Sequence, residues 1–152
     1  WAADFVVPAP TAVLDDLDTL RALRDLFATT PDGQHFIDLY YTYAAETGTM
    51  ALNDPALALE AYAVMQSLLP GFEALVRGHG DDVHVTADMI AQANTLLDEL
   101  SGAGSPQLAA ALATERARFN QLADFEGLTF AQASALLGVT PPGLVYLTEL
   151  SR

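Results

Sequence analysis

Apolar residues recur every three or four positions along most of this 152-residue chain, and this spacing limits its fold more than any other feature. It is the spacing of one face of an α-helix. Over residues 12–27, for example, the apolar stripe consists of Val13, Leu17, Leu20, Leu23 and Phe27. Later stripes begin near residues 31, 55, 86 and 106 at prolines or capping residues, which suit the first turn of a helix. We therefore predict an all-α fold, a compact bundle of about six to eight helices joined by short loops.

Prolines and glycines mark the predicted breaks between helices. Residues 1–12 are expected to form an extended lead-in, because Pro8 and Pro10 oppose an early helix. The pattern also predicts a loop at 48–53 and a helix break at Pro70–Gly71. We expect a single helical domain over 1–152, in which the glycine-rich segment 102–105 is the candidate for a subdomain boundary.

The charge of the chain excludes several classes of partner. Twenty acidic residues stand against six arginines and no lysine, which gives a net charge of −14. Such a chain repels nucleic acids and anionic membranes, so we expect no nucleic-acid partner. The apolar runs are only a few residues long, whereas a membrane span needs roughly 20, so we expect no membrane insertion. The absence of cysteine excludes disulfides and Cys-ligated zinc, and it is compatible with an exported protein.

No set of catalytic residues with workable spacing is visible, so we predict that the chain is not an enzyme and uses no cofactor. The loop over 79–88 resembles a metal site most, with His79, Asp81, Asp82, His84 and Asp88 close together, but it matches neither an EF-hand nor an HExxH helix. We expect it to be a solvated loop that binds no metal. His35 has no evident Ser or Asp partner and is expected to be a core or boundary histidine.

Aromatic residues are densest on the second predicted helix, which joins the first through the turn at 29–33. The candidate binding surface consists of Phe36, Tyr40, Tyr41 and Tyr43 on this helix, with Arg21 and Arg24 on the preceding one. Both faces of the second helix are apolar, which fits either core packing or a surface for a peptide or carbohydrate. The solvent exposure of the tyrosines distinguishes these two interpretations. A further alternative is an aromatic-lined ligand pocket formed by Phe36, Tyr40, Tyr43, Tyr62 and Phe72.

The segment 128–140 resembles the first half of a helix-turn-helix. Thr129 and Gln132 have the spacing of a capping box, and Gly138 falls at the turn. However, residues 139–150 contain no Lys, Arg, Asn or Gln, which are the side chains that contact phosphates and base edges. We therefore predict a structural helical hairpin here, and a DNA-binding regulator is the less favoured alternative.

Three short motifs resemble a known family: Leu20-Arg21-x-Leu23-Arg24-Asp25, Pro31-x-Gly33 and Leu39-Tyr40-Tyr41-x-Tyr43. Together they are similar to the helical segment of the CFI-box family, the C-terminal tails of exported bacterial proteins. The similarity extends over residues 13–77 and is sharpest over 20–43. In the family a cysteine-containing box precedes this segment, whereas residues 11–16 of this chain contain no cysteine.

The resemblance implies an accessory domain of a secreted or surface-attached bacterial protein. Together with the acidic composition, it leads to the main functional prediction. We expect a non-enzymatic helical module, extracellular or at the cell surface, that acts through contact with a protein partner or through self-assembly. The helical ligand-binding domain and the helix-turn-helix regulator stand as alternatives.

Overall fold

The computed structural model describes the backbone of residues 10–142 and the side chains of residues 16–142. Along this part of the chain the elements are α2 (Pro10–Phe27), α3 (Pro31–Asn53), α4 (Pro55–Val76), the 3₁₀ turn η1 (Gly80–Asp82), α5 (Ala87–Ala103), α6 (Pro106–Arg118), the 3₁₀ turn η2 (Ala123–Phe125) and α7 (Phe130–Leu136). Within residues 10–142 there are thus six α-helices and no named strand, and one isolated bridge joins His84 and Thr129. The predicted all-α class is confirmed.

Side-chain caps fix the helix starts that the sequence indicated. The Thr30 side chain accepts a hydrogen bond from the Gly33 amide at 3.0 Å, and Asp54 accepts from two amides of α4. Ser105 caps α6 in the same way, and Thr129 forms a capping box with Gln132 at α7. These bonds satisfy amides that have no partner within the helix, so each cap sets a local boundary.

Two predicted interruptions are wrong. The segment 48–53, expected to be a loop, belongs to α3, which continues to Asn53 and ends only where Asp54 caps the next helix. Likewise α4 runs through Pro70 to Val76 without a break. Proline removes one backbone hydrogen bond and disfavours a helix interior. Here the buried residues on either side, Leu69, Gly71 and Leu75, hold the helix together, because tertiary packing outweighs local propensity.

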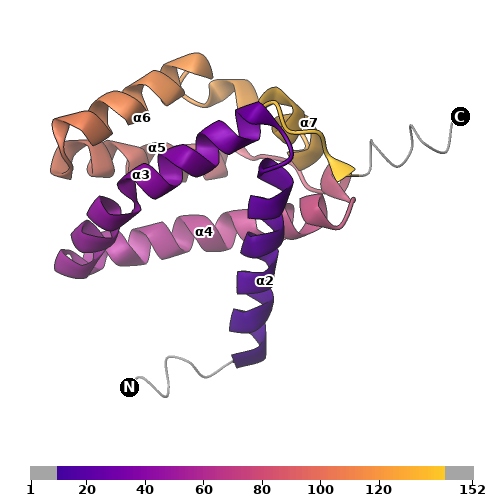
Figure 1. The fold of residues 1–152 in the computed structure, drawn as a ribbon, viewed down its shortest axis with the longest axis horizontal. Helices are drawn as coiled ribbons and strands as arrows, with labels where there is room; N and C mark the ends of the chain where they lie inside the picture. Colours follow the sequence, from indigo (N-terminus) through magenta and orange to yellow (C-terminus); the bar gives the residue numbers. More distant parts are fainter. Residues whose placement is uncertain (1–9, 143–152) are drawn as a thin grey trace, which may run out of the picture.

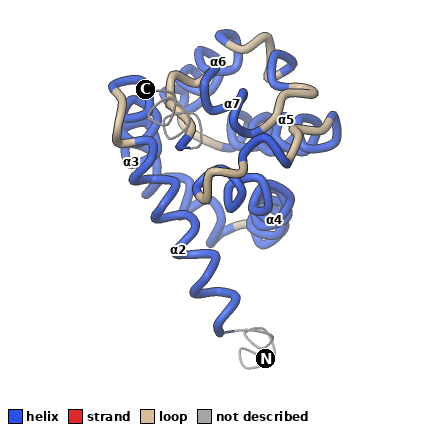
Figure 2. Tube along the Cα trace, turned by 90° about the vertical axis from the view of Figure 1, so that its right-hand side faces the viewer, coloured by secondary structure: helices blue, strands red, loops and turns tan. Residues whose placement is uncertain are grey.

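The helices form two hairpins joined along α4 and α5. In Figure 1, α3 and α4 make one hairpin and α5 and α6 the other, while α2 crosses the end of the first hairpin and packs on both α4 and α3. Figure 2 shows α7 near α4, and α7 packs on η1 and on the same end of α4 that α2 crosses. The first predicted helix begins at Pro10 rather than after a lead-in that reaches residue 12. The rest of the predicted lead-in, residues 1–9, lies outside the described residues.

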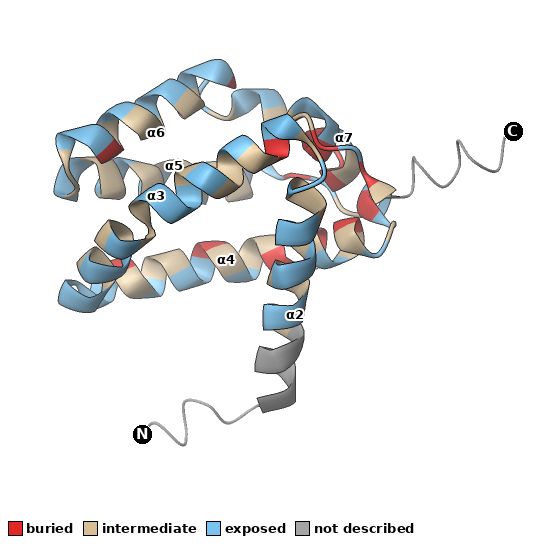
Figure 3. Cartoon of the chain, viewed as in Figure 1, coloured by how far each residue is buried: buried red, intermediate tan, exposed pale blue. Residues whose placement is uncertain are grey.

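The hydrophobic core lies at the end of the molecule where α2, α4, α5 and α7 meet. Leu75, Val85, Phe130 and Ala133 form its buried centre, and the rings of Phe72 and Phe130 meet edge to face at 5.9 Å. Figure 3 shows that buried residues gather around α7 and the adjoining half of α4, whereas α3, α5 and α6 are mostly exposed or half-buried. The hairpin ends away from α7 therefore contribute less to the core.

Polar contacts secure α6, which has little of this core. Glu46 of α3 accepts hydrogen bonds from the Ser105 amide at 2.6 Å and the Ser105 hydroxyl at 2.8 Å. Arg116 donates to Asp98 of α5 at 2.6 Å. The segment 102–105 is thereby tied to α3, and a subdomain boundary in this segment stays a prediction.

Candidate functional site

A groove of about 450 Å³ lies between α2 and α3, with one side chain of α4 contributing to its wall. We call it the α2–α3 groove. The described residues that line it are Leu17, Leu20, Arg21, Leu23, Arg24 and Phe27 of α2, Phe36, Ile37, Tyr40 and Tyr41 of α3, and Met65 of α4. The same i, i+3 and i+4 spacing that defined the apolar stripes brings these residues to facing sides of the two helices.

Five of the six residues predicted as a binding surface line this groove. They are Phe36, Tyr40, Tyr41, Arg21 and Arg24. The exposed fraction is 67% for Tyr40 and 58% for Tyr41, and their rings meet edge to face at 5.4 Å. Core packing is therefore the wrong interpretation for these two tyrosines. Tyr43, the sixth residue, is half-buried and donates a hydrogen bond to the Gln107 carbonyl of α6 at 3.2 Å, because its position turns it toward the second hairpin.

The groove differs from the rest of the chain in its charge. Its described lining holds two of the six arginines of the chain and no acidic residue, although the chain contains twenty. Arg21 and Arg24 contact Asp18 and Asp25 at 3.4 Å along their own helix, and both arginine side chains are at least half exposed. The Tyr41 hydroxyl, and after it the Asp25 carboxylate, raises the pKa of Arg24 above its ordinary value, so this residue keeps its positive charge. The groove is thus apolar inside, and two exposed Arg–Asp pairs lie at its edge.

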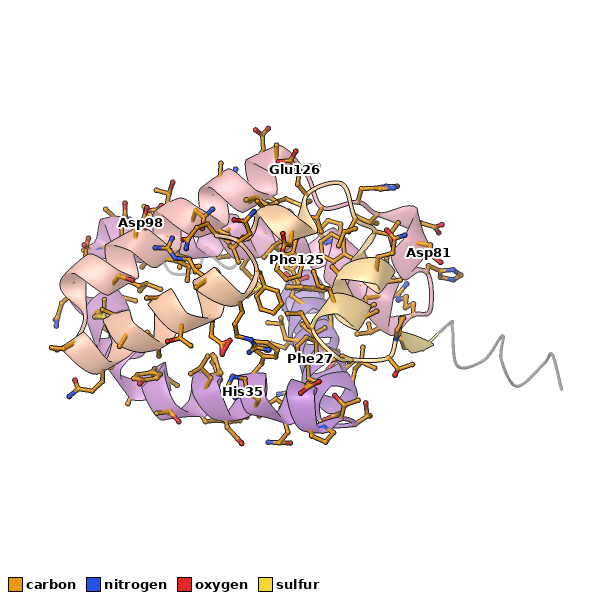
Figure 4. All side chains as sticks on the ribbon, turned by 90° about the horizontal axis from the view of Figure 1, so that it is seen from above. Phe27, His35, Asp81, Asp98, Phe125 and Glu126 are labelled. Atoms are coloured by element: carbon orange, nitrogen blue, oxygen red, sulfur yellow. The ribbon has the colours of Figure 1, made fainter. Side chains whose placement is uncertain are left out.

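The five-residue aromatic pocket predicted from the sequence does not form. Phe36 and Tyr40 line the α2–α3 groove, Tyr43 faces α6, and Tyr62 is 61% exposed on α4. Phe72 lines a separate cavity of about 230 Å³ in the core, which we call the core cavity. In Figure 4 Phe27 and Phe125, which also line the core cavity, lie toward the middle of the molecule, whereas Asp81, Asp98 and Glu126 lie at its edge. Sequence spacing could not assign these aromatic residues to different helix faces.

His35 has a partner that sequence reasoning missed. Its Nε2 lies 2.6 Å from Glu115 Oε1 of α6, and Arg118 donates to the same carboxylate at 2.8 Å. The Arg118 guanidinium also lies over the Phe36 ring, 5.7 Å from its centre. The exposed fraction of the His35 side chain is 49%, so it is a boundary residue and not a core residue. This contact joins α3 to α6 on the side of α3 that faces the second hairpin.

The acidic loop over 79–88 holds α7 in place. Asp81 accepts a hydrogen bond from the Thr129 hydroxyl at 3.1 Å, and the Phe130 amide donates to the Val83 carbonyl at 2.9 Å. His79, Asp82 and His84 are exposed, as expected of a solvated loop. Across the side chains that the structure describes, no three His, Asp or Glu residues are grouped so that they could hold a metal ion.

The segment that resembles a helix-turn-helix is described only in part. Its first helix, α7, ends at Leu136, and Gly138 follows with a φ of +84°, a turn conformation that glycine adopts easily. The second helix of the predicted hairpin would lie beyond residue 142, outside the described residues. The DNA-binding alternative and its rejection both stay predictions.

Comparisons with models of known protein families, with curated proteins and with solved structures give no match. The class of protein is therefore defined by the fold and the groove: an all-α protein with an exposed, aromatic groove between its first two described helices. Among residues 10–142, no helix combines the length and apolarity needed to cross a membrane.

Proposed function

We propose that this chain is a non-enzymatic helical module of a secreted or cell-surface bacterial protein, and that it binds a protein partner in the α2–α3 groove. The observation that carries the proposal is the exposure of Tyr40 and Tyr41 beside two arginines on one apolar groove. Tyrosine and arginine are the side chains most enriched where binding energy concentrates in protein interfaces. Residues that serve only to pack a core do not expose tyrosines and arginines along one groove.

The partner we propose is an amphipathic α-helix with acidic residues beside its apolar stripe. The groove lies between two helices, and a third helix laid in it would cover Leu17, Leu20 and Ile37 as helix-in-groove partners do. Glu or Asp on that helix would pair with Arg21 and Arg24 at the edge of the groove, in place of Asp18 and Asp25. A basic helix would bring its lysines or arginines against the same two arginines.

The secreted or surface location is supported by composition and resemblance. The chain has no cysteine and no lysine, and its motifs over residues 20–43 resemble the CFI-box tails of exported bacterial proteins. The non-enzymatic part of the proposal is supported by the lack of a nucleophile–base pair with workable spacing in the sequence.

Selection from a displayed library of helical peptides, about four turns long, tests the groove directly. We expect the selected peptides to carry apolar residues every three or four positions and an excess of Glu and Asp. Measured by fluorescence anisotropy, their affinity should fall at least about tenfold when Tyr40 and Tyr41 are both changed to alanine. Tyr62→Ala is the matched control, because Tyr62 is equally exposed but lies outside the groove.

Two results would overturn the proposal. Selected peptides that bind the Tyr40→Ala/Tyr41→Ala variant as tightly as the parent chain would show that the groove is not the binding surface. A basic set of peptides would contradict the proposed partner. Sedimentation velocity tests for self-association of the chain. If the chain self-associates and the same double variant does not, the occupant of the groove is a second copy of this chain and not an acidic helix.

A further inference from the structure

The core cavity is bounded by five elements of the fold. Side chains from α2, α4, α5, η2 and α7 surround its volume of about 230 Å³, and it is partly open at the surface. Four phenylalanines, Phe27, Phe72, Phe125 and Phe130, contribute to the wall. Close-packed cores leave few voids larger than a water molecule, whereas this partly open apolar space is well above that size.

The wall offers few hydrogen-bond partners to ordered water. Of the fifteen described residues that line the cavity, Ser134 is the single one with a polar side chain. Its hydroxyl donates to the Val139 carbonyl at 2.7 Å and is therefore already satisfied. A water molecule needs two to four polar partners to stay in a cavity, whereas an apolar cavity of roughly 150 Å³ is large enough to bind benzene. The core cavity is larger than that, and its wall is apolar.

One wall of the cavity is formed by a segment with a strained backbone, residues 120–122, and the turn that follows it. Asn120, Gln121 and Leu122 have φ angles of 55°, 56° and 70°, in the left-handed region that residues other than glycine rarely adopt. Asn94 of α5 holds this segment through a hydrogen bond to the Gln121 carbonyl at 2.9 Å. The segment directs Leu122 and Phe125 to the cavity. Strain of this kind is maintained where surrounding contacts fix the backbone, and it is concentrated at functional sites.

We propose that the core cavity binds a small apolar ligand, a molecule of one or two rings or a short alkyl chain, with no charged group inside the cavity. The four phenylalanines favour a ring, because aromatic rings pack edge to face at low cost. The ligand would fill space that the helices leave open and would add contacts to α2, α5 and α7 at once. This site is separate from the α2–α3 groove, although Leu23 and Phe27 contribute to both walls.

Toluene is the probe, and methyl NMR of the full chain is the measurement. We expect toluene to shift the methyl signals of Met89, Ile90 and Leu122 and to leave those of the exposed Leu52 and Leu59 unchanged. At ten times its Kd it should raise the melting temperature by about 3 °C, because it binds only the folded state.

Matched substitutions on one helix locate the site. Ala93 of α5 lines the cavity, whereas Ala91 of the same helix is exposed. Ala93→Leu fills the cavity and should abolish both the methyl shifts and the thermal shift, whereas Ala91→Leu should keep both. Circular dichroism establishes that each variant is folded, and Ala133→Val serves as a second cavity-filling change. The inference is overturned if saturating toluene leaves the cavity methyls unshifted, or if the shifts persist in the folded filled variants.

Discussion

At the scale of single residues, a few polar side chains decide how the two helical hairpins meet. Glu46 and His35 both lie on α3, and each contacts α6 through partners 59 and 80 positions away in the sequence. Glu46 is half-buried and satisfies the first amide before α6, while its second oxygen accepts from the Ser105 hydroxyl. Hydrogen bonds to a charged acceptor are stronger than those between neutral groups.

Glu46→Ala should therefore lower the free energy of unfolding by about 1–2 kcal/mol, because it leaves the Ser105 amide without its acceptor. Urea denaturation monitored by circular dichroism provides the measurement. Glu73→Ala is the control: Glu73 pairs with Arg77 at 3.2 Å on the exposed side of α4, and such pairs contribute less than about 1 kcal/mol. Equal losses in the two variants would show that Glu46 is not a structural cap.

At the scale of helices, two glycines differ in the space around them, Gly71 in α4 and Gly48 in α3. Gly71 lies inside α4 directly beneath Phe130 of α7, and a Cβ at this position would overlap the phenylalanine ring. Gly48 lies inside α3 with open space around it. Both glycines weaken their helices locally, since glycine is the least favourable ordinary residue in a helix interior. Only Gly71 is required by a neighbouring element.

Alanine substitution at the two glycines should change stability in opposite directions. Gly71→Ala is expected to destabilise the protein by about 1–3 kcal/mol, because Phe130 must move out of its place in the core. Gly48→Ala should stabilise it by about 0.5–1 kcal/mol through the better helix propensity of alanine. Thermal and urea denaturation of both variants would measure the change in the free energy of unfolding. A Gly71→Ala protein as stable as the parent would contradict the described packing of α4 on α7.

At the scale of the whole molecule, negative charge opposes the folded state. The net charge of −14 makes the carboxylates repel one another when the chain is compact. A local instance is Glu60 of α4, whose pKa is raised, first by its hydrogen bond with Glu99 of α5, then by burial and by the charge of that residue. A raised folded-state pKa favours folding below the ordinary pKa of Glu, near pH 4, and this contribution is lost as the pH rises through the folded-state value.

Salt should therefore stabilise this protein at neutral pH. About 0.5 M NaCl shortens the range of repulsion between exposed charges to a few ångströms and should raise the melting temperature. The gain should shrink near pH 5, where part of the carboxylate charge is already neutralised, and Glu60→Gln should reduce it at neutral pH. Calorimetry in matched buffers would measure both effects, and a melting temperature that falls with added NaCl would contradict the expected role of the charge.

Much of the fold is determined locally and could be predicted from the sequence. The caps at Thr30, Asp54, Ser105 and Thr129 act within one helical turn, so their residue types alone place the helix starts. The same holds for most of the candidate site. α2 and α3 are adjacent in sequence and joined by a short turn, so their apolar stripes, with Tyr40 and Arg24, lie close together, although α4 packs on both helices and adds Met65 to the wall.

Only the tertiary structure decided which faces are covered and which helices continue. Pro70 and Gly48 are unfavourable inside helices when judged by local propensity, yet packing on either side of Pro70 keeps α4 continuous, and α3 extends to the cap at Asp54. The separation of the aromatic residues between the α2–α3 groove, the core cavity and α6 depends on how the helices cross. Crossing is set by side-chain contacts between residues dozens of positions apart, and a local pattern contains no information about them.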